Sequence, residues 1–437
     1  MPRSTFILPL LLVMSLGSCD GPASHEYDFV DVPQPAPAKI PEPPRPVESG
    51  ASSEADADGC GRATGRNAKG ECEQLHTREL AYVQQVQLPA GRFVMGDIPQ
   101  SYAAEIGRHD PRERWAGQPP RYAEAPAFWI DLHEVTREAY AKCVAAGQCT
   151  EASCPDGRDP VDKYSEDAAR LVPQTCVTHE QAARFCEAHE GRLPTEIEWE
   201  YAARGPDARL FPWGNDMRDE YTAMLMPISA TPGDISYFGI RGMGTSALEW
   251  IAEPYQVDAG LQSFLPGPFR RADGPLLRAE STRAPRFVMK GGKAGARRDM
   301  GPADPRVGFR CVADLGPGEE PLTVPAEPPA IPLMRAAGSS LAVFGGVVEA
   351  VDRREAEAFC DVLRVEFEGQ VHEDWRLPTL VEVQSIAQVF RGPGPFWAAD
   401  GAIVQRGGGK LGPDEPWEQD EAEPSDALVA RCVHDAG

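Results

Sequence analysis

Several residue patterns that mark common classes of protein are absent from this sequence. It has no Cys-x-x-Cys pair, and none of its eight histidines stands beside a pair of cysteines, so the usual zinc-binding spacings are missing. It has no Gly-x-Ser-x-Gly turn, which would carry a hydrolase nucleophile. Only two asparagines occur, Asn67 and Asn215. Beyond the N-terminal region, no stretch is apolar enough to predict a transmembrane helix.

Positive charge is also scarce. The chain has 43 lysines and arginines against 67 aspartates and glutamates, which gives a net charge of −24 and a pI near 4.8. Such a surface repels phosphate backbones and anionic headgroups. We therefore expect no nucleic-acid partner and no electrostatic attachment to anionic lipid.

The first 19 residues have the pattern of an exported lipoprotein. Arg3 precedes an apolar run, Phe6 to Met14, which is too short to span a bilayer. Leu16-Gly-Ser-Cys19 then has the form of a lipobox. We predict that residues 1–18 are a signal peptide and that acylated Cys19 anchors the chain in a lipid bilayer of the bacterial cell envelope, facing the periplasm or the surface. The alternative is an ordinary secretory signal with an incidental cysteine.

Two stretches have the composition of linkers. Residues 19–58 are rich in proline, alanine and acidic residues, which predicts a disordered tether. Residues 316–332 are again rich in proline and are interpreted as a linker between two folded units. The predicted organisation is therefore a small cysteine loop at 59–79, a main domain at 80–315 and a C-terminal domain at 333–437.

The cysteine count indicates an oxidising compartment. Removing Cys19 from the 11 cysteines leaves ten, which predicts five disulfides rather than a metal site. Cys60 and Cys72 form the simplest local pair. Four further cysteines allow three connectivities that the sequence does not distinguish: Cys143, Cys149, Cys154 and Cys176.

The sequence of the main domain predicts the N-termini of three helices. Thr136 precedes a segment with apolar residues at helical spacing, which makes it a good N-cap. Thr178 with Gln181, and Thr195 with Glu198, have the spacing of capping boxes. Residues 88–96 alternate as a strand does, and Phe211-Pro-Trp-Gly-Asn215 is typical of a turn.

The run Arg-Leu-Pro-Thr-Glu-Ile-Glu-Trp-Glu-Tyr-Ala-Ala-Arg at 192–204, followed by Phe-Pro-Trp-Gly-Asn, resembles the formylglycine-generating (sulfatase-modifying factor) family. Gly308-Phe-Arg-Cys311 matches another of its signatures. The resemblance implies an α+β, loop-rich variant of the C-type-lectin-like fold. It also implies oxidation of a substrate cysteine to formylglycine by a pair of active-site cysteines that bind copper, because thiolates are the soft ligands that hold Cu(I).

The cysteines that this chemistry needs are missing. In the family they lie between an Arg-Gly-Gly-Ser segment and the Gly-Phe-Arg-Cys segment, and here the stretch from Lys290 to Arg310 holds none. The resemblance further implies that Cys186 and Cys311 bridge each other. We therefore name no catalytic residue, and we expect no copper cofactor.

A second departure concerns calcium. The family's Gly-Leu-Tyr-Asp-Met-Ala-Gly-Asn-Val-Trp-Glu-Trp segment aligns with Gly239 to Trp250, where its Asn is replaced by Ser246. Calcium takes six to eight oxygen ligands. Asp234 and Glu249 remain as candidate ligands of a degraded calcium site.

Other polar residues are interpreted as structural. Arg192 and Glu196 are read as a buried scaffold pair rather than a ligand site, and Trp199 and Trp250 as core residues. Three histidines stand at unrelated spacings, which favours core or surface positions over metal ligation: His133, His179 and His189.

The C-terminal region repeats part of the main domain. An alanine-containing segment ending in Phe-Cys, followed by Arg-Leu-Pro-Thr, occurs at 177–195 and again at 351–379. The repeat predicts a disulfide between Cys360 and Cys432. With the following Pro-Phe-Trp at 395–397, this region resembles a small lectin-like domain of bacterial adhesins and lipoproteins.

We therefore expect a disulfide-stabilised α+β protein of two lectin-like units that binds an envelope protein or glycan instead of catalysing a reaction. Two alternatives stay open. One is a formylglycine-generating-type oxidase with an atypical site, and the other is a structural component of an envelope or surface machine. Free-thiol content distinguishes the first alternative from the binding hypothesis, since an oxidase of this type needs two unpaired thiols.

Overall fold

The computed structural model describes most of the chain after residue 62. The described residues are 63–96, 120–155, 157, 161, 163–215, 225–228, 230, 233–254, 270–271, 274–275, 287–291, 293–300, 303–324, 327–331, 341–343, 348–350, 353–367, 369–379, 381–382, 396–397, 399, 403–406, 417–420, 428–430 and 432–435. The predicted signal peptide, Cys19, the tether and Cys60 lie outside them. Within this described part, no helix has the length and apolarity needed to cross a membrane.

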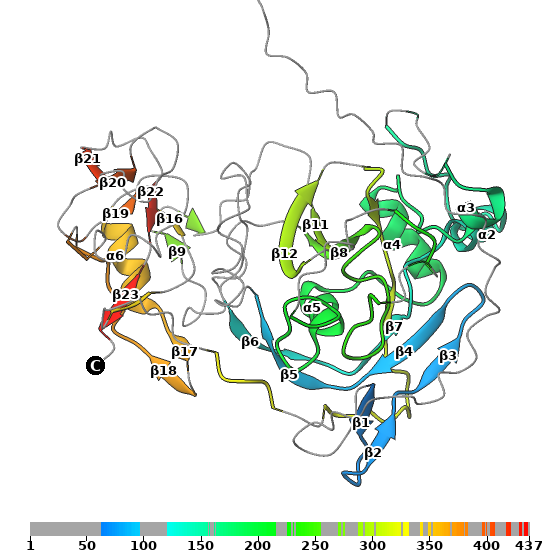
Figure 1. The fold of residues 1–437 in the computed structure, drawn as a ribbon, viewed down its shortest axis with the longest axis horizontal. Helices are drawn as coiled ribbons and strands as arrows, with labels where there is room; N and C mark the ends of the chain where they lie inside the picture. The colour runs from blue at the N-terminus through cyan, green and yellow to red at the C-terminus, as the bar shows by residue number, and fades with distance from the viewer. Residues whose placement is uncertain are drawn as a thin grey trace, which may run out of the picture. The chain divides into compact units, whose positions relative to one another are not determined.

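We call residues 63–324, as far as they are described, the main unit. An antiparallel sheet in the order β14-β7-β4-β3 joins its two ends. Figure 1 labels β7, β4 and β3 of this sheet. Its strands are β3 Thr77–Glu79, β4 Gln84–Leu88, β7 Phe128–Asp131 and β14 Val312–Asp314. The chain therefore returns after 182 residues (312 − 130) to pair Val312 with Ile130. Two hairpins adjoin it: β1 Thr64–Arg66 with β2 Cys72–Gln74, and β5 Gly91–Met95 with β6 Arg121–Ala125.

A second sheet has the order β12-β11-β8-β13. Its strands are β8 Leu248–Pro254, β11 Phe287–Gly291, β12 Lys293–Met300 and β13 Val307–Gly308. β13 runs parallel to β8, and the other pairs are antiparallel. A short pair, β9 Arg270–Arg271 with β10 Gly274–Pro275, precedes β11.

The three helix starts predicted from the sequence are confirmed. α2 Arg137–Ala145 begins after Thr136, whose side chain accepts a hydrogen bond from the Ala139 N–H. α4 His179–Ala188 and α5 Glu196–Arg204 each begin with the complete predicted capping box. A short helix not foreseen from the sequence, α3 Glu166–Arg170, begins after Ser165.

Helix α5 lies against strands of both the β5–β6 hairpin and the second sheet (Figure 1). Its burial agrees with these contacts, because every residue from Trp199 to Arg204 is buried. Trp199 and Trp250 are fully buried, as predicted, and they lie in two adjoining apolar clusters that form the core.

The C-terminal region forms its own sheets, with the main one in the order β16-β22-β19-β20-β21. Its elements are β15 Leu341–Val343, β16 Val348–Ala350, α6 Arg353–Val362, β17 Val365–Phe367, β18 Gln370–His372, β19 Phe396–Trp397, β20 Ile403–Arg406, β21 Trp417–Asp420, β22 Leu428–Ala430 and β23 Val433–Asp435. The architecture of the chain is thus α+β and loop-rich, consistent with a C-type-lectin-like fold.

Part of the stretch interpreted as a linker is packed. Thr323 makes backbone bridges to Arg66 and Ala90, and Leu322 is 2% exposed. Residues 322–324 therefore extend the hydrogen bonding of the main unit.

Four disulfides are described: Cys143–Cys149, Cys154–Cys176, Cys186–Cys311 and Cys360–Cys432. The last two are the predicted pairs. The first two choose one of the three connectivities that the sequence left open. Cys72 is also disulfide-bonded, and its predicted partner Cys60 lies outside the described residues.

Candidate functional site

Arg192 joins the start of helix α5 to the last strand of the main unit. Its guanidinium donates to both oxygens of Glu198 at 2.7 Å and to Asp314 at 2.7 Å. The same Glu198 accepts the Thr195 N–H at 2.8 Å, so one carboxylate both caps the helix and binds the arginine. Although burial raises the pKa of Glu198, the bonds from Arg192 and Thr195 outweigh it and lower that pKa. We call Arg192, Thr195, Glu198 and Asp314 the main clamp.

The prediction that Arg192 pairs with Glu196 was wrong, because Arg192 binds Glu198 instead. Glu196 is the first residue of α5, and its side chain contacts Lys290 at 3.2 Å. Glu198 is two residues further round the helix, on the side that faces Arg192. The structural interpretation of Arg192 holds, because its contacts fasten a helix to a strand.

The C-terminal unit contains the same arrangement. Arg376 donates to both oxygens of Glu382 at 2.8 and 2.7 Å and also contacts Asp435, while Glu382 accepts the Thr379 N–H at 2.8 Å. The bond from Arg376 lowers the pKa of Glu382 to about 2. We call this set the C-terminal clamp. A backbone bridge from the arginine to the last strand, and a disulfide beside it, also recur.

A second charged centre lies deep in the main unit. Arg310 and Glu249 are both 0% exposed, and the guanidinium donates to the two carboxylate oxygens at 2.7 Å each. Trp199 donates its indole N–H to Glu249 at 2.7 Å. Arg310 also donates to the main-chain oxygens of Asp131 and Arg241. These contacts connect β7, α5 and β8 with the Gly-Phe-Arg-Cys segment.

Three more buried carboxyl groups surround this pair. Burial raises the pKa of Asp131 to about 7, although hydrogen bonds from the Gln85 side chain and the Cys311 N–H oppose the rise. Burial, followed by the charge of Glu249, raises the pKa of Glu134. Burial also raises the pKa of Asp234. Burial therefore raises the pKa of all three carboxyl groups around the Arg310–Glu249 pair.

The contacts of Glu249 do not fit the calcium role considered from the sequence. Both of its oxygens are engaged by Arg310 and Trp199. Asp234 uses Oδ2 to accept the N–H groups of Gly244 and Thr245 and the Thr245 hydroxyl. Among the described residues, no group of three or more His, Cys, Asp or Glu side chains has the arrangement of a metal site. Calcium binding at the degraded site considered from the sequence, with Asp234 and Glu249 as its candidate ligands, stays a prediction.

Lys290 stands where the family's Arg-Gly-Gly-Ser segment begins, and it is buried. Its ammonium contacts Glu200 at 2.5 Å and Glu196 at 3.2 Å on α5. Glu200 in turn accepts the Gly96 N–H at 2.6 Å, and Arg204 donates to the Gly96 oxygen. This cluster was missed from the sequence. Its one signal was the i, i+4 spacing of Glu196, Glu200 and Arg204, which places the three side chains on one face of a helix.

Two of the three histidines considered earlier are tied to main-chain oxygens, and burial lowers the pKa of the third. His179 Nε2 contacts the Ile251 oxygen at 2.9 Å, and His189 Nδ1 contacts the Phe185 oxygen at 2.7 Å. Burial, with the charges of Arg310 and Arg241, lowers the pKa of His133 to about 4, which makes it neutral at pH 7. Hydrogen bonding and packing therefore account for their positions.

The chain is thus a disulfide-braced, loop-rich α+β protein in which residues of the Arg-Leu-Pro-Thr and Gly-Phe-Arg-Cys segments bind neighbouring helices and strands. The sequence pattern of the family described as "Sulfatase-modifying factor enzyme 1-like domain" matches residues 71–315, more than half of the chain. The chain belongs to this family.

Two relatives and one solved structure illustrate the similarity. The chain is 25% identical to the formylglycine-generating enzyme of Mus musculus over 342 residues, which cover 61% of this chain and 89% of the mouse protein. It is also 25% identical to the inactive C-alpha-formylglycine-generating enzyme 2 of Mus musculus, over 57% of this chain and 92% of that protein. The structure of PvdO from Pseudomonas aeruginosa aligns with 55% of this chain and 98% of its own, at 21% identity and a TM-score of 0.40.

Proposed function

We propose that this protein is a non-catalytic, lipid-anchored envelope protein that uses a sulfatase-modifying-factor scaffold for binding or assembly. One observation carries the proposal. The stretch from Lys290 to Arg310, where the family places its reactive cysteine pair, contains no cysteine. A copper-dependent oxidation of a substrate thiol has no thiolate ligands there.

The state of the other cysteines supports the same view. All nine cysteines among the described residues are in disulfides. A disulfide sulfur is neither a thiolate nucleophile nor a Cu(I) ligand. Similarity to an active enzyme and to an inactive relative leaves activity undecided, so the cysteine inventory has to decide it.

The charged residues that match the family's signature segments, or replace residues in them, hold the fold together. The main clamp, the Arg310–Glu249 pair and the Lys290 cluster fasten helices and strands together. Long loops on such a braced scaffold suit recognition. The partner we infer is an envelope protein or a glycan, reached from a bilayer by the acyl chains on Cys19 and the tether at 19–58. The negative net charge supports a partner other than nucleic acid.

The free-thiol content tests whether the protein lacks the cysteine pair that the family's oxidation needs. The exported protein, purified in air without reductant, would be unfolded in denaturant with an alkylating agent, and its intact mass measured. We expect no added label. A labelled pair of cysteines would overturn the proposal, and peptide mapping would then locate the reactive site.

Anchoring is tested separately. A Cys19→Ser variant should move from the membrane fraction to the soluble envelope fraction and lose incorporation of labelled fatty acid. A Cys60→Ser variant serves as the control and should stay with the membrane. Retention of the Cys19→Ser variant in the membrane would contradict lipid anchoring.

A further inference from the structure

The disulfide Cys154–Cys176 differs from the other described disulfides in its exposure. Cys154 is partly exposed, whereas its partner Cys176 is 4% exposed. The other three pairs consist of buried cysteines: Cys143–Cys149, Cys186–Cys311 and Cys360–Cys432. Thiol–disulfide exchange requires an attacking thiolate to reach one sulfur atom. Among the four disulfides whose two cysteines are both described, Cys154 is therefore the most accessible point of attack. Cys72 is exposed as well, and it is bonded to a partner outside the described residues.

Cys176 is also the one described disulfide cysteine with a left-handed backbone. Its φ is +59°, a region that non-glycine residues seldom occupy. Two contacts on this residue help to keep that conformation. One is the bond to Cys154, and the other is the hydrogen bond from the Cys176 N–H to the Asp304 oxygen at 3.1 Å. Breaking the first contact leaves the strained residue held by the second.

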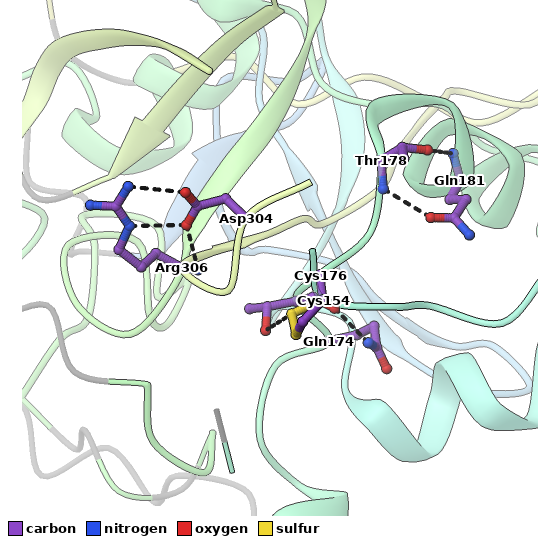
Figure 2. Close-up of a disulfide and its surroundings, with 8 residues drawn as sticks. Cys154, Gln174, Cys176, Thr178, Gln181, Asp304 and Arg306 are labelled. Atoms are coloured by element: carbon purple, nitrogen blue, oxygen red, sulfur yellow. Dashed lines mark hydrogen bonds and ion pairs between the residues drawn. A yellow bond between two sulfur atoms is a disulfide. The ribbon is translucent and has the colours of Figure 1, made fainter. Parts of the chain in front are cut away.

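The Asp304 oxygen belongs to a tight turn that leads into β13. Figure 2 shows Asp304 and Arg306 paired beside the disulfide, with the Asp304 carboxylate accepting both the Arg306 N–H at 2.8 Å and its guanidinium Nε at 2.9 Å. The Val307 N–H also donates to the Asp304 main-chain oxygen. The Arg306 oxygen accepts the Leu248 N–H at 2.8 Å. Cys176 is therefore coupled through this turn to β8, the strand that carries Glu249.

We propose that Cys154–Cys176 is a redox-sensitive disulfide, which a dithiol reductant reduces while the other three disulfides with both cysteines described remain oxidised. A thiolate of the reductant attacks Sγ of Cys154, a mixed disulfide forms and Cys176 leaves as the thiolate. The second thiol of the reductant then displaces Cys154, so the reductant becomes a disulfide and the protein gains two thiols. Released from Cys154, Cys176 relaxes out of the left-handed region, and its hydrogen bond to Asp304 weakens.

A reductant titration on the full-length protein tests the order of opening. Samples equilibrated at graded dithiothreitol concentrations would be trapped by alkylation and mapped by peptide mass. We expect half-labelling of Cys154 and Cys176 at a concentration at least tenfold below that of the other three pairs. Labelling of this pair together with the others, or after them, would overturn the proposal.

Amide hydrogen exchange tests the coupling. Reduction at the lowest effective concentration should accelerate exchange in the peptides that contain Cys176 and Val307 at least tenfold. A Cys154→Ser/Cys176→Ser variant should reproduce this change, and a Cys143→Ser/Cys149→Ser variant should not. Unchanged exchange at Val307 in the reduced wild-type protein would show that the turn does not sense the bond, and this measurement needs no variant to fold.

Discussion

The two clamps have the same atoms in the same contacts but different degrees of burial. In the main clamp the Glu198 side chain is 3% exposed, whereas in the C-terminal clamp Glu382 is 21% exposed. The two arginines are equally exposed, at 38% and 39%. The geometry is therefore independent of depth, while the energy of the contact depends on it, because solvent screens the more exposed pair.

The comparison also distinguishes contacts made mainly within one short sequence from contacts between distant segments of the chain. The arginine, threonine and glutamate of each clamp lie within a short repeated sequence, Arg-Leu-Pro-Thr-x-x-Glu. The arginine also binds an aspartate on a strand, Asp314 or Asp435. The Arg310–Glu249 pair instead joins segments from distant parts of the main unit and is completely buried. We infer that the clamp is a local arrangement that occurs in both parts of the chain. The buried Arg310–Glu249 pair instead holds distant segments of the main unit together.

The largest expected effect is at Arg310. Replacing it with methionine leaves Glu249 buried without its partner and close to other carboxyl groups, so we expect a loss of about 3–5 kcal/mol of unfolding free energy. Chemical denaturation measures this loss, with exposed Arg306→Met as the matched control. A loss at Arg310 no greater than at Arg192 would break the distinction between the central pair and the clamps.

The pH dependence should have opposite signs in two regions of the molecule. The pKa of Asp131 is about 7 in the folded chain, against 3.8 for an ordinary aspartate. Its contribution to stability is therefore full below about pH 4 and is lost as the pH rises through 7. The pKa of Glu382 is about 2, so its contribution is present above about pH 4.5 and is lost as the pH falls through 2.

Denaturation between pH 5 and pH 8 checks the first of these signs. We expect the wild-type main unit to lose stability on the order of 2–4 kcal/mol as the pH rises. Asp131→Asn should flatten the profile, whereas Asp314→Asn at an exposed position should leave it unchanged. An equally steep profile in Asp131→Asn would assign the dependence to another group.

The clamps themselves provide the next test. Arg192→Ala leaves Glu198 almost fully buried, and we expect a loss of about 2–3 kcal/mol. Arg376→Ala leaves a partly solvated Glu382, and we expect a loss of about 1 kcal/mol. Thermal and chemical denaturation of both variants give the comparison, and equal losses would show that burial does not set the energy.

The smallest expected effect is at the helix caps. Thr195→Ala removes a hydroxyl that accepts the Glu198 N–H in α5, and Thr379→Ala removes one that accepts the Glu382 N–H; each should lose about 1 kcal/mol. Replacement by serine, which keeps the hydroxyl, should restore most of the stability. A loss that serine does not recover would assign the effect to the methyl group instead.

Local features were the most predictable from the sequence. The N-caps at Thr136, Thr178 and Thr195 follow from short-range spacing, and the structure confirms them. Burial of Trp199 and Trp250 follows from their size and apolarity. Features that depend on which helix face meets which strand were missed, since sequence spacing alone does not fix that orientation.

The partner of Arg192 illustrates this limit. Glu196 and Glu198 are both close in sequence, and only the direction in which α5 packs selects Glu198. The repeat held an unused signal, because the arginine and glutamate are separated by the same six positions in both copies, at 192–198 and 376–382. The Lys290 contacts join residues about 90 positions apart, and no local pattern predicts them.

Peptide turnover tests the central claim most directly. The purified protein would be incubated in air with copper, a thiol reductant and a sulfatase-type peptide containing one cysteine, and the peptide mass would be followed beside an active family member. We expect the cysteine to remain unconverted here while the active enzyme produces the aldehyde. Conversion of the peptide to formylglycine by this protein, at a rate that scales with its concentration, would contradict the account.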